Sequence, residues 1–313
     1  MLETLPEGTA SEGSGWRGAA ALIAVVFFAL GVSASVLLAV PFLLLVGMKG
    51  IRGLGMFAAV LVAMLVTASG VPDGVWFMDR AWALLVGGLF VALSLARPMS
   101  KLSTRALLAV LGAGAVTAAF ISLRAGAWGA VDWAINDRVQ FTIAQALEQV
   151  VNWRQGEALA PAFVLSMYEV AEAQMEVFPA ITGLTSMAAL CVVWWLYARL
   201  TSSDQPGLGP LKEFRFNDQL VWVFVGGLLL LVTRAGEPLG RVGANAMVFM
   251  GVLFALRGAA VVVFISGGVS LVGLLVVTVG LVLVPALVLS GALVIGIGDV
   301  YLDVRGRVAE LAA

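Results

Sequence analysis

Long apolar runs separated by short polar segments make up most of the chain. They cover residues 18–48, 55–70, 81–96, 106–123, 180–198, 220–233 and 245–298. A transmembrane helix needs about 20 predominantly apolar residues. The pattern therefore predicts an all-α fold, a polytopic transmembrane helical bundle with about eight to ten membrane-embedded segments.

The number of segments depends on two runs that are longer than one span. Residues 18–48 contain Pro41 and residues 269–298 contain Pro285, so each run forms either one long helix or two short ones. Within 245–298, only Gly267-Gly268 and Pro285 interrupt the apolar sequence. We expect a turn at Pro285, because it would return the C-terminal arginines to the side of the other basic loops.

Basic and acidic loops alternate and indicate the orientation of the chain. Three loops are basic, with charges at Lys49 and Arg52, at Arg97, Lys101 and Arg105, and at Arg199, Lys212 and Arg215. The intervening segments, around Asp73 and Asp79 and across 124–178, are acidic. Since Lys and Arg accumulate in cytoplasmic loops, the basic loops are predicted to be cytoplasmic and the acidic segments external.

The same pattern divides the chain into successive parts. Residues 1–17 are acidic, rich in Gly and Ser and without the basic start of a signal peptide, which predicts a disordered cytosolic tail. Transmembrane helices are expected in 18–123 and 179–307, on either side of an external segment at 124–178. Residues 308–313 are expected to form a C-terminal tail.

The external segment is predicted to be helical and amphipathic. Apolar residues in 139–153 recur at helical spacing, and Pro161 occupies a helix-opening position. Glu169, Glu172 and Glu176 are three and four residues apart and share one helix face. This external acidic face is either a solvated surface or a lid that attracts cations or pairs with Arg257.

Composition excludes several classes of function. Of the 313 residues, 61% are hydrophobic and 12% charged, so the bilayer must solvate most of the surface. A net charge of −1 provides no basic field for nucleic acid. The chain has no histidine, one cysteine (Cys191) and no recognisable nucleotide-binding, serine-hydrolase or zinc-peptidase motif. We therefore expect a non-enzymatic protein without catalytic residues, metal or cofactor.

One charge, Arg257, lies inside an apolar run at 246–266. Ionisable residues within a span face protein, water or a counter-charge, and they mark functional sites. Asn245 begins the same helix but lies about 18 Å away along it. The candidate partners of Arg257 are Asp299, Asp303, Glu237 and the external acidic face. Arg257, Asn245 and Asp299 are the predicted ligand-binding residues, and an arginine that caps carbonyls or extends to a headgroup is the structural alternative.

Two features are predicted to contact a partner protein. Ala20 and Ala24 place small residues one turn apart, which permits close helix packing. Acidic and basic residues alternate after the last apolar run, including Asp303 and Arg305. This segment serves either as a topology anchor or as a docking surface for a cytoplasmic partner.

Three segments of the C-terminal half resemble a known family. They are FRFNDQLVW at 214–222, LRGAAV at 256–261 and GDVYLDVRGR at 298–307. Together they resemble the YybS-like family of uncharacterised bacterial membrane proteins, most strongly over 211–307. Such proteins look related to the substrate-binding S components of energy-coupling-factor transporters. The resemblance implies a multi-pass protein of the bacterial inner membrane, a ligand cavity toward the external side, and a partner subunit contacted through Ala20 and Ala24.

Two functions fit these observations. The first is a small-molecule-binding transporter component that holds its ligand beneath the external acidic segment, with Arg257 binding an anionic group or a helix carboxylate. Since the chain has no ATP-binding motif, such a component needs a partner for energy. The alternative is a membrane scaffold or assembly protein that docks partners through the cytoplasmic loop 201–218 and the C-terminal tail.

Overall fold

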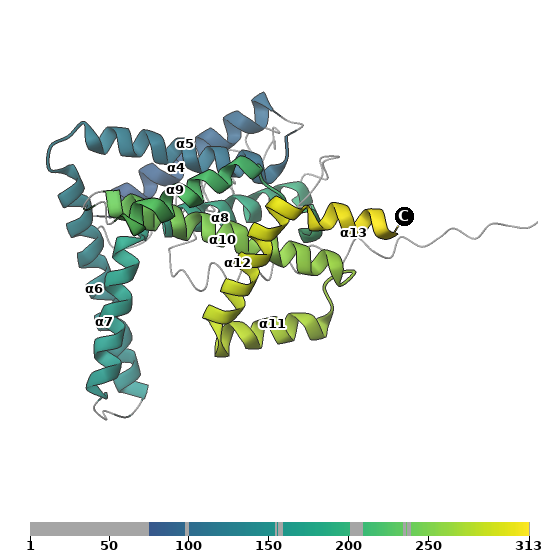
Figure 1. Cartoon of the computed structure of the whole chain (residues 1–313). Coiled ribbons are helices and arrows are strands. Elements are labelled where there is room, and N and C mark those ends of the chain that lie inside the picture. The colour runs from purple at the N-terminus through teal and green to yellow at the C-terminus, as the bar shows by residue number, and fades with distance from the viewer. Residues whose placement is uncertain are drawn as a thin grey trace, which may run out of the picture. The chain divides into compact units, whose positions relative to one another are not determined.

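The structure is a computed structural model that describes residues 75–97, 100–153, 155, 159–200, 209–233, 236 and 239–312. Every regular element in these ranges is helical (Figure 1), which confirms the all-α fold class. Within these ranges, five helices are long and apolar enough to span a membrane, namely Trp76–Ala96, Leu102–Ser122, Phe178–Trp195, Leu239–Ile265 and Pro285–Leu302. The N-terminal tail, the apolar runs before residue 75 and the pair Ala20 and Ala24 lie outside the described residues, so the total number of segments stays a prediction.

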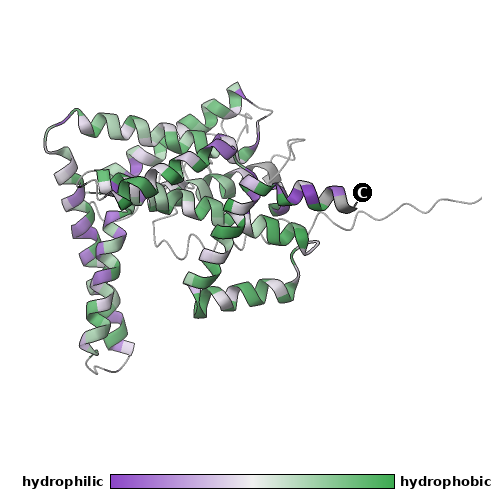
Figure 2. Cartoon of the chain, viewed as in Figure 1, coloured by the Kyte–Doolittle hydropathy of each residue, from purple (hydrophilic) through white to green (hydrophobic). Residues whose placement is uncertain are grey.

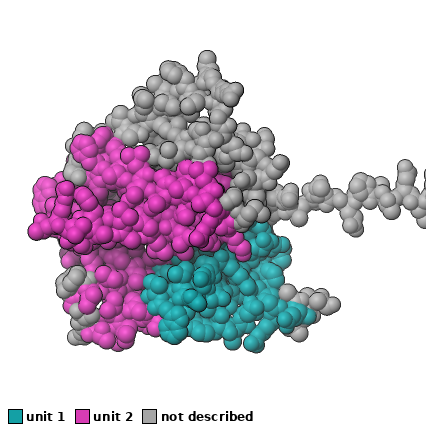
Figure 3. Space-filling model, turned by 90° about the horizontal axis from the view of Figure 1, so that it is seen from above, with its two compact units in different colours: residues 1–29, 204–224, 250–313 teal, residues 30–203, 225–249 magenta. Residues whose placement is uncertain are grey.

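The chain divides into two compact units, coloured separately in Figure 3. Among the described residues, unit 1 covers 209–224 and 250–312, and unit 2 covers 75–200 and 225–249, apart from the gaps given above. The two units share helices, because the division falls within α9 (Val221–Val232) and α10 (Leu239–Ile265).

Unit 2 contains three packed helices and a separate helical pair. The packed helices are α4 (Trp76–Ala96), α5 (Leu102–Ser122) and α8 (Phe178–Leu200). The pair consists of α6 (Ala127–Trp153) and α7 (Pro161–Glu176), which lie side by side in Figure 1. Polar and apolar residues are mixed along both helices of the pair (Figure 2), as the amphipathic pattern predicts.

The core of unit 2 forms around small residues on α5. Ala106, Ala109 and Ala113 are fully buried and three or four residues apart, so they form a narrow face that neighbouring helices can approach closely. Phe90 on α4 and Trp194 on α8 meet edge to face in this core, with ring centroids 6.2 Å apart. Aromatic contacts of this kind add to the area that the helices bury.

Three boundaries differ from the sequence-based expectation. α10 begins at Leu239, six residues before Asn245, which was expected to begin it. α6 begins at Ala127 rather than near 139, because Ile135 lies eight residues before Ile143 and both are buried on the same helix face. Arg105 was expected in a basic loop, but α5 begins at Leu102 and includes it. Its side chain is buried, because the guanidinium lies over the ring of Trp194.

Unit 1 joins a short irregular segment to the C-terminal helices. The irregular segment carries two single turns of 3₁₀ helix, η1 (Leu211–Glu213) and η2 (Asp218–Leu220), before α9 begins. The second half of α10 is followed by α11 (Leu271–Leu283), α12 (Pro285–Leu302) and α13 (Val304–Ala312).

Both predicted interruptions of the last apolar run are present. After α10, Gly267 and Gly268 adopt φ angles of 72° and 143°, which residues other than glycine rarely adopt. Ser270 then caps α11 by accepting a hydrogen bond from the backbone of Gly273 at 2.9 Å. Pro285 opens α12 directly after α11 has ended. The 13 residues of α11 extend about 20 Å, which is less than the hydrocarbon core of about 30 Å.

Unit 1 contains a close crossing of α10 and α12. A Cβ atom added to Gly258 would fall on the carbonyl of Ala292, and one added to Gly296 would fall on the carbonyl of Phe254. The two glycines thus allow the two backbones to touch. Arg257 is adjacent to Gly258, and Asp299 follows Gly296 by three residues, so the crossing brings these two charges toward each other.

We predict that Gly258→Ala and Gly296→Ala each destabilise the protein. The added methyl group would separate the two helices, at a cost of about 1–3 kcal/mol typical of overpacking. Gly291→Ala on α12 is the matched control, because a Cβ atom there meets nothing within 4 Å. Thermal unfolding of the purified protein in one detergent measures the effect, and equal melting temperatures for all three variants would contradict the crossing.

Candidate functional site

The buried charge at Arg257 is fully engaged by acceptors within unit 1. The residue is 2% exposed. Its Nε donates to Oδ2 of Asp299 at 2.8 Å, and its Nη2 lies 3.4 Å from the backbone carbonyl of the same residue. Its Nη1 forms an ion pair with Asp218 at the start of η2. Of the two partners expected for Arg257, an anionic ligand group or a helix carboxylate, the structure shows a helix carboxylate.

Asp299 binds a second arginine as well. Its side chain is fully buried, and Arg305 donates to it from Nη2 at 2.8 Å and from Nε at 3.4 Å. The chain reverses between the two residues at Asp303, whose φ of 40° places it in the left-handed region. This reversal between α12 and α13 returns Arg305 to the carboxylate six residues earlier.

Arg305 also binds the irregular segment before α9 through hydrogen bonds. Its Nη1 donates to the backbone carbonyls of Lys212 and Phe214, both at 3.0 Å. At the surface, Arg215 pairs with Asp303 at 2.5 Å, and both side chains are substantially exposed. The predicted cytoplasmic loop and the C-terminal segment are therefore parts of one connected structure.

We call Asp218, Arg257, Asp299 and Arg305 the charged cluster. It contains two cations and two anions, so its formal charge is zero. Buried ions are tolerated only when they are paired and hydrogen-bonded. Arg257, Asp299 and Arg305 are buried and meet both conditions, whereas the side chain of Asp218 is 62% exposed. Phe216 adds a cation–π contact, with the guanidinium carbon of Arg257 5.5 Å from the ring centroid. Chemically, the arrangement fixes helices and a loop, because each nitrogen of Arg257 already has an acceptor.

The other predicted ligand residue, Asn245, has a different neighbourhood. Its Oδ1 accepts from the backbone N–H of Ala180 at 2.8 Å, and its Nδ2 donates to the carbonyls of Glu176 and Arg241, both at 2.9 Å. Asn245 thus bonds the junction of α7 and α8. Its separation from Arg257 along α10 means that the structure does not bring these two residues together.

The sequence alone did not single out Asp218. It follows Asn217, whose side chain accepts from the backbone of Gln219 at 3.0 Å and caps the turn. The small number of acidic residues could have indicated it. After residue 214 the sequence contains only Asp218, Glu237, Asp299, Asp303 and Glu310. Few carboxylates in this part of the chain could therefore pair with Arg257.

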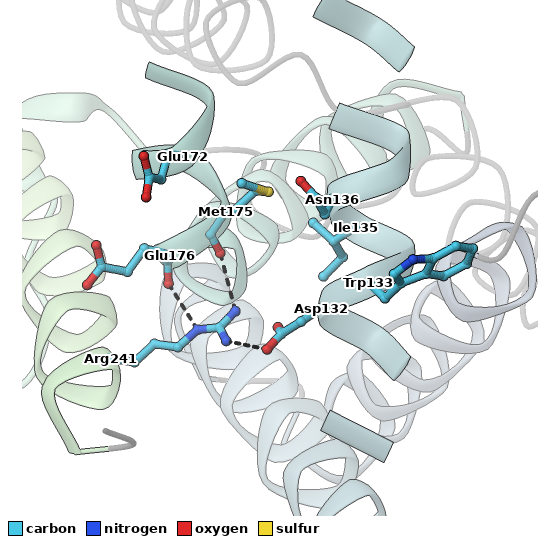
Figure 4. Close-up of a pocket in the computed structure, with 8 residues that line it drawn as sticks. All are labelled: Asp132, Trp133, Ile135, Asn136, Glu172, Met175, Glu176 and Arg241. Atoms are coloured by element: carbon cyan, nitrogen blue, oxygen red, sulfur yellow. Dashed lines mark hydrogen bonds and ion pairs between the residues drawn. The ribbon is translucent and has the colours of Figure 1, made fainter. Parts of the chain in front are cut away.

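A second polar site lies in unit 2, between the α6–α7 pair and the start of α10. It is an open hollow of about 590 Å³ lined by Asp132, Trp133, Ile135, Asn136, Glu172, Met175, Glu176 and Arg241. Figure 4 shows the guanidinium of Arg241 between the carboxylate of Asp132 and the last carbonyls of α7. The Arg241–Asp132 ion pair measures 2.8 Å.

The hollow contains two residues of the external acidic face. Glu172 and Glu176 line it, whereas Glu169 does not, and all three residues are exposed on α7. Three carboxylates, including Asp132, therefore outnumber the single cation Arg241. In the described part of the chain, no group of three or more His, Cys, Asp or Glu residues has an arrangement suited to a metal ion.

We predict that Asp299→Ala strongly destabilises the protein, because it leaves two buried guanidinium groups without their shared carboxylate. Breaking a buried pair in this way costs about 3–5 kcal/mol. Asp303→Asn is the control, since it removes only the exposed pair with Arg215, and asparagine tolerates the left-handed backbone. Chemical denaturation in detergent, monitored by tryptophan fluorescence, measures the free energy of unfolding of both variants. A similar loss of stability in the two variants would contradict the structural role of Asp299.

Comparison with known proteins identifies the family to which the chain belongs. No curated protein and no solved structure matches the chain. A family described as "Predicted membrane protein (DUF2232)" matches residues 19–300, a region that includes most of the charged cluster and the whole hollow. The apolar spans and this match agree, and the chain belongs to the DUF2232 family of predicted membrane proteins.

Proposed function

We propose that this membrane protein is the small-molecule-binding component of a transport system in the bacterial inner membrane. Its ligand would bind in the hollow between α6, α7 and α10. The volume of about 590 Å³ falls in the range of about 300–1,000 Å³ that is usual for ligand pockets. The similarity of the C-terminal motifs to YybS-like proteins, and through them to transporter S components, supports the same assignment.

One observation carries this proposal. Oδ1 of Asp132 is buried and has no hydrogen-bond donor among the described residues, while Oδ2 of the same carboxylate is paired with Arg241. A buried acceptor without a donor costs about 1–3 kcal/mol. A ligand that brings an N–H group would satisfy this oxygen, and the excess of carboxylates favours a cationic ligand such as an organic amine.

In this proposal Arg257 has a supporting role. Its acceptors are the carboxylates of Asp218 and Asp299, so it stabilises the frame of unit 1 instead of binding the ligand. The acidic face on α7 then supplies the charge that attracts the ligand. Energy for transport would come from a partner protein, because the chain has no ATP-binding motif.

Native mass spectrometry of the detergent-purified protein from its own host tests the proposal. We predict a stoichiometric small cationic molecule on the wild type that is lost in the double variant Glu172→Gln and Glu176→Gln. Glu169→Gln is the matched control, because it makes the same change on the same helix outside the hollow. Failure to find a bound small molecule, or its retention in the double variant, would refute this function.

The second candidate function is a membrane scaffold that docks a cytoplasmic partner. It is favoured by the way Arg305 ties the segment around Lys212 to α13, because this holds two charged surface segments in one fixed arrangement. The side chains of Lys212 and Arg307 are exposed and are not members of the charged cluster.

For the scaffold, we predict that Lys212→Glu combined with Arg307→Glu abolishes co-purification of a protein partner. The change reverses surface charge and leaves the buried ion pairs of Arg257 and Arg305 intact, so folding should persist. Affinity purification from membranes, with melting temperature as the folding control, makes the comparison. A partner that stays bound to the folded double variant would argue against docking through this surface.

A further inference from the structure

Arg105 differs from the other arginines that are buried in the described part of the chain. It is the fourth residue of α5 and is 5% exposed. Its Nε and Nη1 are buried, and no described residue supplies a hydrogen-bond acceptor to either of them. By contrast, Arg257 and Arg305 bind Asp299, and Arg80 donates to the carbonyl of Trp76 at 3.0 Å.

The aromatic contact of Arg105 satisfies only its charge. The guanidinium carbon lies 4.4 Å from the ring centroid of Trp194 on α8. Such a cation–π contact contributes about 0.5–2 kcal/mol, but a ring face is a much weaker hydrogen-bond acceptor than an oxygen atom. Burial of a cation with unsatisfied donors is costly unless an acceptor joins it. The described part of the chain supplies no such acceptor to Nε or Nη1 of Arg105.

A second unsatisfied polar group lies at the same end of this helical hairpin. Ser94 is buried on α4, and its Oγ has no hydrogen-bond partner among the residues that the structure describes. Ser94 lies two residues before α4 ends, and Arg105 lies three residues after α5 starts. Both are thus within about one helical turn of the connecting loop, which also carries the exposed side chains of Arg97 and Lys101.

The chemistry of these groups identifies the class of ligand. A planar guanidinium presents paired N–H donors that match the oxygen atoms of a phosphate group. The hydroxyl of Ser94 supplies one more donor, and the two exposed cations make the local potential positive. Loop charges predict this end of the hairpin to be cytoplasmic, at the level where basic sites between helices meet anionic headgroups.

We propose that Arg105 and Ser94, with Trp194 beneath the guanidinium, form a phosphate-binding site at the loop end of α4 and α5. The phosphate belongs either to the headgroup of an anionic phospholipid or to a free phosphate compound. Either source would complete the hydrogen bonds of Arg105 and join α4, α5 and α8 at this end. The site is separate from the hollow lined by α6 and α7 and does not depend on the function proposed for it.

Thermal stability of the full-length protein tests the site. We expect the melting temperature in detergent to rise when phosphatidylglycerol is added, and to rise less with phosphatidylcholine. Arg105→Met removes the guanidinium and retains an apolar side chain. The concentration of phosphatidylglycerol needed for the same rise in melting temperature should therefore increase about tenfold or more. Arg97→Gln is the matched control, because it removes one exposed charge from the same loop and should retain most of the response.

A second arm separates the two sources of phosphate. Sodium phosphate is compared with sodium chloride at equal ionic strength on delipidated protein. Stabilisation by phosphate, with no further gain from phosphatidylglycerol, assigns the site to a free phosphate compound. A gain from phosphatidylglycerol alone assigns it to lipid.

Measurements on the wild-type protein test the site independently of Arg105→Met. Wild-type protein that retains no phospholipid in native mass spectrometry and is stabilised by neither probe would overturn it. An equal response of Arg105→Met and Arg97→Gln would overturn it as well. Should Arg105→Met not fold, Arg105→Lys keeps the charge and loses the paired donors, and an unchanged response of that variant would also count against the site.

Discussion

A charge that leaves water has to find its counter-charge within the protein, and unit 1 is organised around that requirement. Arg257 could not remain on α10 without a carboxylate, and Asp299 could not remain buried on α12 without a cation. The close glycine crossing, the left-handed reversal at Asp303 and the return of Arg305 all bring these groups within bonding distance. The ion pairs therefore join α10, α12 and α13 within unit 1.

The sequence predicted what depends on local composition. The all-α class, the helix start at Pro161 and the breaks at Gly267-Gly268 and Pro285 follow from residue type and apolar spacing, which act over a few residues. The partner of Arg257 was narrowed to a short set that included Asp299, but Asp218 was missed. Which of two distant charges meet depends on how helices cross, and a hydropathy pattern does not contain that information.

Arg105 illustrates the same limit. From the sequence it belonged to a basic loop, because a charge beside an apolar run usually remains in water or at the headgroups. In the structure, the narrow alanine face of α5 brings α8 close enough for Trp194 to cover the guanidinium. Burial of that side chain is a property of three packed helices and of no single segment. The hollow at Asp132 and Arg241 likewise combines the consecutive helices α6 and α7 with α10, which lies much later in the sequence.

The order of the charged cluster along the chain has a consequence for biosynthesis. Its members appear as Asp218, Arg257, Asp299 and Arg305, with alternating sign. As the polypeptide emerges from the ribosome, their running total is −1, then 0, then −1, then 0. The growing chain thus never holds more than one unbalanced charge of this group. Each cation that enters the membrane finds an acidic residue already made, which limits the electrostatic penalty at every stage of insertion.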